Sequence, residues 1–225
     1  MMRWLNRLIE RTKGEQFKLD CRIPKSYLMQ FVLAKLFQLL YGALRLQRLI
    51  YLHHTATVKC KQKLTSGKNL RIDRGCYIDA LSSDGITFGD NVSIGKMTTI
   101  ECTGSLKDIG KGLSVGNNVG LGTHGFFGCA GGIEIGNDTI FGNYVSLHAE
   151  NHNYADPNTP IRQQGVNRKG IRIGSNCWIG AKATILDGTI LGDGCIVAAG
   201  AVVSGTFAND SIVGGVPARF IKSRI

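Results

Sequence analysis

Features that identify several protein classes are missing from this sequence. Its seven cysteines form no C-x-x-C pair and show no spacing typical of a zinc site. Glycine is frequent, at 30 residues, but it does not recur at every third position as in collagen. With 43% hydrophobic and 19% charged residues, the composition excludes an intrinsically disordered chain. The 225 residues suffice for one large domain, or for one domain and an additional arm.

Acidic residues are scarce in the first part of the chain. Residues 1–65 contain 13 Lys and Arg against 3 Asp and Glu, a net charge of +10, whereas residues 66–225 sum to +1. A basic segment of this kind suits a nucleic acid or an anionic membrane surface. Because the longest apolar stretch lies in the same segment, we favour the membrane surface and expect no nucleic-acid partner.

An uninterrupted membrane-spanning segment is also missing. Residues 27–52 are largely apolar, but Lys35, Arg45 and Arg48 interrupt them, whereas a spanning helix needs about 20 consecutive apolar residues. We therefore predict a helical, basic and amphipathic arm over residues 1–65 that lies on an anionic membrane surface. Alternatively, the helix caps the end of the main domain or joins subunits. No small-residue cleavage site follows, so we expect no signal peptide but a cytoplasmic protein, peripheral on the inner face of the cytoplasmic membrane.

A period of six residues dominates the rest of the chain. From Ile173 it reads "IGSNCW", "IGAKAT", "ILDGTI", "LGDGCI" and "VAAGAV", and earlier copies include "IGNDTI" at 135 and "FGDNVS" at 88. Six fits neither a helix nor a plain strand, but it fits a short strand followed by a turn. The aliphatic residue and the small residue four positions later are expected to point inward. Such units bury their apolar face only by stacking, so the pattern predicts a solenoid of parallel strands.

The cysteines fit this solenoid. Cys76, Cys177 and Cys195 fall on the small-residue position of the repeat. We therefore predict that the cysteines are buried, reduced and structural, as in a cytosolic protein.

These repeats, with "CWIGAKATIL" at 177–186 and "GGVPARFIK" at 214–222, resemble the hexapeptide-repeat acyltransferases. The resemblance covers residues 70–222 and implies a left-handed parallel β-helix, with three hexapeptides per coil and about six coils. The general preference for right-handed crossovers would not have predicted this hand. We expect a mainly β domain over residues 66–225, preceded by the arm over residues 1–65.

The loop 148–170 interrupts the period and contains two of the five histidines. "NHNY", "PIRQQG" and "IRIGSNCWIG" follow one another in an order similar to that of the sugar O-acetyltransferases of this family, and the resemblance assigns the catalytic position to His152. A neutral imidazole can accept the proton of an acceptor hydroxyl as that oxygen attacks a thioester. The expected acceptor-side residues are His124, His148, Glu150, Asn151 and Asp156.

The resemblance also implies acetyl-CoA as the donor and no metal. Small residues let the narrow pantetheine arm approach the backbone, and positive side chains suit the phosphates. One stretch departs from the family, because "VVSGTF" at 202–207 lacks the lysine often found near the nucleotide. Trp178 has core packing as its alternative role. The expected donor-side residues are Trp178, Gly180, Ala181, Ala199, Gly200, Arg219 and Lys222.

The sequence therefore predicts an O-acetyltransferase that modifies a sugar hydroxyl in a cell-surface polysaccharide precursor (O-antigen, capsule or exopolysaccharide), lipid-linked or not. By resemblance it is a homotrimer with active sites between subunits. One alternative is a zinc carbonic anhydrase of the same fold that uses His124, His148 and His152, although the spacing here is H-x3-H rather than H-x4-H. The others are an amine acceptor and a non-catalytic scaffold.

Overall fold

The computed structural model describes residues 19–225, so the predicted membrane contacts of the basic residues before Leu19 lie outside it. The chain divides into two compact units after Phe37. Helix α2 (Lys25–Leu46) begins in the first unit and ends in the second. Pro24 precedes it, a residue whose fixed φ suits a helix start, and Gln47 follows it with φ 58°, a common conformation just after a helix end.

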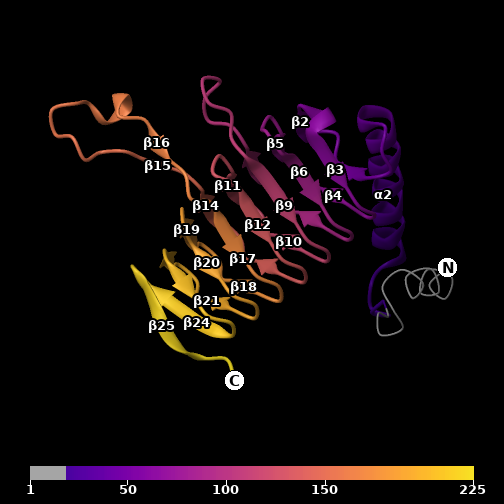
Figure 1. Cartoon of the computed structure of the whole chain (residues 1–225). Helices are drawn as coiled ribbons and strands as arrows, with labels where there is room; N and C mark the ends of the chain where they lie inside the picture. The colour runs from indigo at the N-terminus through magenta and orange to yellow at the C-terminus, as the bar shows by residue number, and fades with distance from the viewer. Residues whose placement is uncertain (1–18) are drawn as a thin grey trace. The chain divides into compact units, whose positions relative to one another are not determined.

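The second unit is a parallel β-helix, as predicted (Figure 1). Seven coils each add one strand to each of three sheets, which we call A, B and C in chain order. Sheet A contains β1 (Tyr51–Leu52), β4 (Arg71–Ile72), β7 (Ser93–Ile94), β10 (Gly120–Leu121), β13 (Ile140–Phe141), β18 (Trp178–Ile179), β21 (Ile196–Val197), β24 (Ser211–Gly215) and the antiparallel β25 (Ala218–Ser223).

The other two sheets contain seven strands each. Sheet B contains β2 (Thr57–Lys59), β5 (Tyr77–Asp79), β8 (Thr99–Glu101), β11 (Phe126–Gly128), β14 (Ser146–His148), β19 (Thr184–Leu186) and β22 (Val202–Val203). Sheet C contains β3 (Leu64–Ser66), β6 (Gly85–Phe88), β9 (Gly112–Val115), β12 (Ile133–Ile135), β17 (Ile171–Ile173), β20 (Ile190–Leu191) and β23 (Thr206–Phe207).

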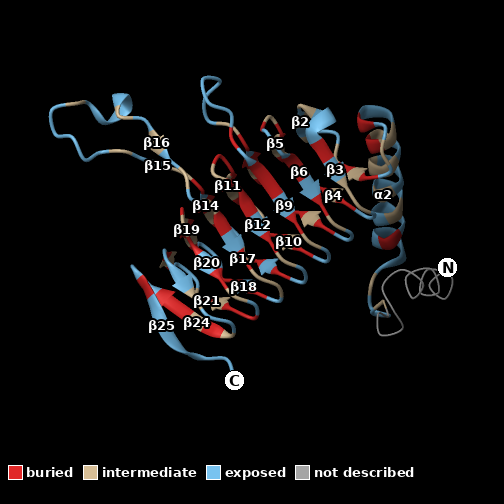
Figure 2. Ribbon diagram, viewed as in Figure 1, coloured by how far each residue is buried: buried red, intermediate tan, exposed pale blue. Residues whose placement is uncertain are grey.

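The inward positions follow the predicted rule. Ile173 and Cys177 are both buried, as are Ile179 and Ala183 one repeat later. Figure 2 shows buried positions recurring along the stacked strands of the β-helix. Burying these aliphatic side chains contributes about 1.5–3 kcal/mol each, so the single internal core dominates stability.

The first coil extends beyond the predicted domain. The boundary expected between residues 65 and 66 falls inside β3, because residues 51–66 already form β1, β2 and β3. This coil contains no glycine, whereas the later repeats are recognised in the sequence by their glycines. The end of α2 belongs to the same packed unit, since Leu46 lies in the core and Tyr41 packs against it.

Two of the turn types that join the sheets share the same backbone geometry. We call the turns from sheet C to sheet A the C/A corner, and those from sheet A to sheet B the A/B corner. At the C/A corner, residues with positive φ form a ladder: Asn91 Nδ2 donates to Asn118 Oδ1 at 2.9 Å, and Asn118 Nδ2 donates to Asp138 Oδ1 at 2.8 Å. Asparagine tolerates this left-handed conformation, which costs other residues about 1–2 kcal/mol.

The predicted burial of the cysteines is confirmed for five positions and wrong for two. Cys76, Cys102, Cys129, Cys177 and Cys195 are buried, and burial raises the pKa of the Cys177 thiol to about 11. Cys21, before α2, is exposed and Cys60, in a turn before the 3-10 helix η1 (Lys61–Lys63), is partly exposed. Cys21 lies outside the repeats, whereas Cys60 packs against the core at the open end of the β-helix.

Candidate functional site

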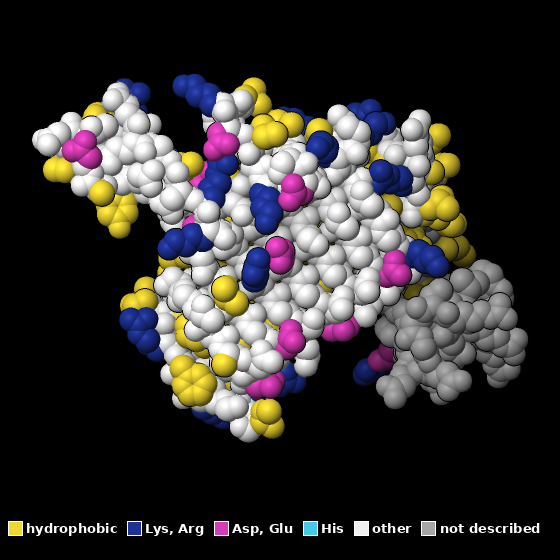
Figure 3. All heavy atoms as spheres, viewed as in Figure 1, with side chains coloured by type: hydrophobic (Ala, Val, Ile, Leu, Met, Phe, Trp, Pro, Cys, Tyr) yellow, Lys and Arg dark blue, Asp and Glu magenta, His cyan; other side chains and the backbone are white. Residues whose placement is uncertain are grey.

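The loop 148–170 forms an antiparallel hairpin that projects from the β-helix. It leaves sheet B after β14, pairs β15 (Asn151–His152) with β16 (Val166–Asn167), and rejoins sheet C at β17 (Figure 1). Figure 3 shows it as a separate lobe. Its tip includes the 3-10 helix η2 (Ile161–Gln163), and Gln164 orders it by donating to Asp156 O at 2.8 Å and Thr159 O at 2.6 Å.

A buried carboxylate holds the base of the hairpin. Asp187, at the end of β19, is only 8% exposed and accepts the backbone N–H groups of Lys169 at 2.9 Å and Gly170 at 2.8 Å. It also accepts Asn151 Nδ2 at 3.4 Å. Because Asn151 starts the hairpin and Gly170 ends it, a single carboxylate fixes both strands to the β-helix.

A second brace links the hairpin to another insertion. Arg168 pairs with Glu150 at 2.7 Å and with Asp108 at 2.9 Å, and Asp108 belongs to the insertion between β8 and β9. Most of the Arg168 side chain is buried, which strengthens ion pairing relative to an exposed pair. The base of the hairpin is therefore rigid at two points.

The predicted base, His152, lies just above these braces. Its side chain is exposed, and no hydrogen bond to its ring occurs among residues 19–225. Its backbone is fixed by pairing with Val166 across the hairpin. The imidazole is thus positioned through its backbone while both ring nitrogens remain open to a substrate.

The predicted acceptor-side residues are distributed over four places. Glu150 and Asn151 serve the braces just described. Asp156 lies at the hairpin tip, where the Thr159 hydroxyl and the Asn158 amide hold the pKa of its carboxyl below the ordinary value. His148 lies on sheet B with its ring 5.4 Å from that of Phe126, and His124 lies at the A/B corner.

The three histidines of the zinc alternative are therefore separated along the coil. In the part of the chain that the structure describes, no group of three or more His, Cys, Asp or Glu is arranged to hold a metal ion.

The predicted donor-side residues gather on the last coils. Trp178 points outward from sheet A with 53% of its surface exposed, so it is not a core residue. Ala181, Ala199 and Gly200 are exposed at the A/B corner, and a β-carbon at Gly200 would meet only open space. Arg219 and Lys222 are exposed on β25, which contacts β22 and β24.

Gly180 differs from the other donor-side residues. It is buried, and a β-carbon there would lie 2.5 Å from Ala199 N. The close stacking of two coils therefore explains this glycine without any ligand.

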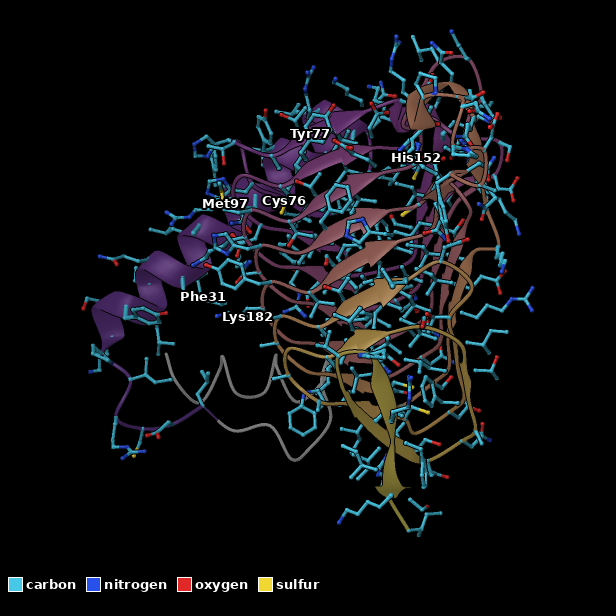
Figure 4. The ribbon with its side chains drawn as sticks, turned by 90° about the vertical axis from the view of Figure 1, so that its left-hand side faces the viewer. Phe31, Cys76, Tyr77, Met97, His152 and Lys182 are labelled. Carbon is cyan, nitrogen blue, oxygen red and sulfur yellow. The ribbon has the colours of Figure 1, made fainter. Side chains whose placement is uncertain are left out.

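One chain does not bring the predicted base and the donor-side residues together. The hairpin leaves the far end of the sheet B strands, whereas Ala181 and Ala199 lie at the A/B corner, before those strands begin. Three residues of strand separate the two ends, a distance of about 10 Å. In Figure 4, Lys182 at the A/B corner and His152 accordingly lie on opposite sides of this sheet.

Sequence reasoning missed Asp187, Arg168 and the serine pattern at 112–116. "GLSVG" matches the letters of a G-x-S-x-G nucleophile elbow, but Ser114 lies within β9, between two parallel strands, rather than at a strand-to-helix turn. Asp187 has no local signal, because its partners lie 17 to 36 residues away in sequence.

We expect Asp187→Ala to loosen the hairpin while the coils stay folded. Removing this acceptor leaves buried N–H groups unsatisfied, which costs about 1–3 kcal/mol. Amide hydrogen exchange over residues 151–169 should then accelerate, whereas Asp193→Ala, which removes an exposed carboxylate at the C/A corner, should leave it unchanged. Equal hairpin exchange in the Asp187 variant and the parent chain would contradict the brace.

Known proteins resemble this chain over most of its length. A family model described as bacterial transferase hexapeptide (six repeats) matches residues 170–205. A putative lipopolysaccharide biosynthesis O-acetyl transferase of Escherichia coli, WbbJ, is 30% identical over 165 residues, or 69% of this chain and 80% of that protein. A probable acetyltransferase of Mycobacterium tuberculosis is 34% identical over 140 residues, or 62% of this chain but only 44% of that protein.

The fold is also that of a solved acyltransferase. The crystal structure of AntD, an N-acyltransferase from Bacillus cereus in complex with dTDP and 3-hydroxybutyryl-CoA, has a TM-score of 0.52 and 20% identity, covering 78% of this chain and 80% of that one. At this identity the likeness concerns the fold alone. With the repeats, the three-sheet coil and the Escherichia coli relative, the chain belongs to the hexapeptide-repeat acyltransferases, enzymes built on a left-handed parallel β-helix.

Proposed function

We propose that this protein is an O-acetyltransferase that moves the acetyl group of acetyl-CoA to a sugar hydroxyl, with His152 as general base. The observation that carries the proposal is the exposed imidazole of His152 on a hairpin braced by Asp187 and Arg168. The acceptor we propose is a cell-surface polysaccharide precursor such as O-antigen, capsule or exopolysaccharide. The name of the Escherichia coli relative, a lipopolysaccharide O-acetyl transferase, supports this class.

The reaction is a direct transfer. One ring nitrogen of His152 accepts the hydroxyl proton while that oxygen attacks the thioester carbonyl, and a tetrahedral intermediate forms. The C–S bond then breaks, and the departing sulfur takes the proton from the imidazolium. The products are the acetyl ester and free CoA, and His152 is again neutral.

The separation of His152 from the donor-side corner supports a site between two copies of the chain. In a homotrimer, the hairpin of one subunit would present His152 to Ala181, Ala199 and Gly200 of its neighbour. The small side chains at this corner leave room for a pantetheine arm. Arg219 and Lys222 supply positive charge for the CoA phosphates in place of the absent lysine.

The alternatives receive less support. The three histidines of a zinc site lie on the hairpin, on sheet B and at the A/B corner, so no single chain offers them as a ligand set. A non-catalytic scaffold predicts no CoA binding, which calorimetry would test directly. An amine acceptor has one supporting observation, because AntD is named an N-acyltransferase, but that chain is only 20% identical.

His152→Ala should lower the rate of acceptor-dependent CoA release by about 100-fold or more, the usual contribution of a positioned general base. The measurement is thiol-detected CoA release with wild-type and variant protein side by side. His54→Ala changes an exposed histidine of the first coil and serves as the control, with a rate close to wild type. Near-normal turnover by the His152 variant would refute the base assignment.

We also propose that residues 1–65 hold the enzyme on an anionic membrane surface, on the cytoplasmic side. Helix α2 is long and apolar enough to cross a membrane by length and composition, but Lys35 lies in its middle. No Asp or Glu occurs between Asp20 and Asp73, whereas this stretch contains ten Lys and Arg. Apolar side chains gather at the surface of α2, as Figure 3 shows. The exposed ones are Tyr27, Met29, Phe31, Leu33, Leu36, Phe37, Leu40 and Leu44.

Vesicle sedimentation tests the membrane proposal. The protein should pellet with vesicles of phosphatidylcholine and 30% phosphatidylglycerol at low salt and be released at about 0.5 M NaCl, where charge attraction is screened. Phe37→Ser with Leu40→Ser should weaken binding, whereas Ile190→Ser, at an exposed position of sheet C, should not. Equal binding to vesicles of phosphatidylcholine alone, or none to either, would overturn it.

A further inference from the structure

Two corners of the β-helix have the same backbone conformation but different side chains. Each C/A turn contains one residue with positive φ, and so does each A/B turn from the second coil on. At the C/A corner these residues are Asn69, Asn91, Asn118, Asp138, Asn176, Gly194 and Asp210. At the A/B corner, from the second coil on, they are Gly75, Met97, His124, Tyr144, Lys182 and Gly200.

The A/B residues occupy equivalent, stacked positions. The N–H of His124 donates to Lys96 O at 2.8 Å, and that of Tyr144 donates to Thr123 O at 2.8 Å. The N–H of Lys182 likewise donates to Asn143 O at 2.9 Å. Each N–H thus donates to the carbonyl of the residue that precedes the equivalent corner residue one coil earlier. Figure 4 shows Met97 and Lys182 along this edge.

The turn itself does not explain these side chains. The C/A corner closes the same turn with Asn, Asp and Gly, the residues that tolerate positive φ best. Methionine, tyrosine and lysine are strained there, so Met97, Tyr144 and Lys182 are retained at a cost to the fold. Strain of this kind, when a less strained residue is available, indicates a use outside the turn.

The central pair of this edge is an aromatic stack. The rings of Tyr144 and His124 are stacked, with centroids 4.7 Å apart and an angle of 19° between their planes. Tyr144 is 55% exposed, and Met97, one coil before His124, is 51% exposed. Ala181 and Ala199, on the donor side, lie at the same corner one and two coils after Tyr144.

We propose that Tyr144 and His124 form a platform on which a sugar ring of the acceptor stacks, next to the donor. This proposal rests on the proposed function, because it assigns the acceptor surface of that same site. A pyranose ring presents C–H groups on its face and hydroxyls at its rim. The face of the Tyr144 ring that is turned away from His124 suits the C–H groups, and the Tyr144 hydroxyl and His124 nitrogens suit the rim. Tyr144 is then a specificity-determining residue.

The test compares Tyr144→Asn with Tyr144→Phe. Asparagine removes the ring but keeps the turn conformation, so the Asn variant should unfold at the same or a higher temperature than wild type. Its KM for the acceptor should rise about tenfold or more, with the KM for acetyl-CoA within about twofold. The Phe variant keeps the ring and should retain most acceptor affinity. Asn176→Gly, at the equivalent C/A position, is the control and should change neither constant.

The probes are maltose, lactose, cellobiose, N,N′-diacetylchitobiose and a sialic acid disaccharide, with binding followed by saturation-transfer NMR and turnover by CoA release. An unchanged acceptor KM in Tyr144→Asn, or no binding of any probe to wild type, overturns the platform. A lower unfolding temperature with a changed oligomeric state also overturns it, because the pair would then be a subunit contact. Binding that depends on Tyr144 without turnover supports the platform and contradicts the acetyltransferase proposal. Turnover with an unchanged acceptor KM in Tyr144→Asn supports the acetyltransferase proposal and contradicts the platform.

Discussion

The stacking of one coil on the next by parallel backbone hydrogen bonds is the constraint on which the rest of this structure depends. Each strand passes its hydrogen bonds to the strand one coil later, as in Ile140 to Trp178 and Trp178 to Ile196. Strands stacked about 4.8 Å apart leave no space for side chains between coils, so the inward side chains fill one close-packed core. Most of them are aliphatic or small, and Phe88 and Phe127 are buried there as well. Chemistry is confined to outward positions, to corners and to insertions.

The hairpin that carries His152 follows from this constraint. The 22 residues 149–170 leave the stack and still return in register, because Asp187 holds the start and the end of the excursion to β19. Arg168 connects the same base to a second insertion. The corners are the second place where side chains can leave the regular pattern. The A/B corner has larger side chains at the positions with positive φ, whereas the C/A corner has Asn, Asp or Gly there.

The coils could be predicted from sequence because the same positions are buried in repeat after repeat. Ile173 and Cys177 point inward, as do the equivalent residues of the other repeats. The first coil escaped prediction because residues 51–66 contain no glycine, although they obey the same stacking. The departure of residues 148–170 from the coils was readable from the interrupted period. The braces were not, because Asp187 and Asp108 are distant in sequence from the hairpin they hold. The distance between His152 and the donor-side corner depends on where the strand between them lies, which no local pattern specifies.

The central claim is that His152 of one subunit acts at the donor-side corner of another. Complementation tests it most directly, with His152→Ala and Ala199→Trp chains carrying different tags, co-expressed and purified through both tags. Each variant alone should be inactive, one lacking the base and the other blocked for CoA. Mixed oligomers should regain a substantial fraction of wild-type CoA release, because an interface pairing an intact hairpin with an intact corner is restored. Mixed oligomers as inactive as the single variants would contradict the claim, since every site would then lie within one chain.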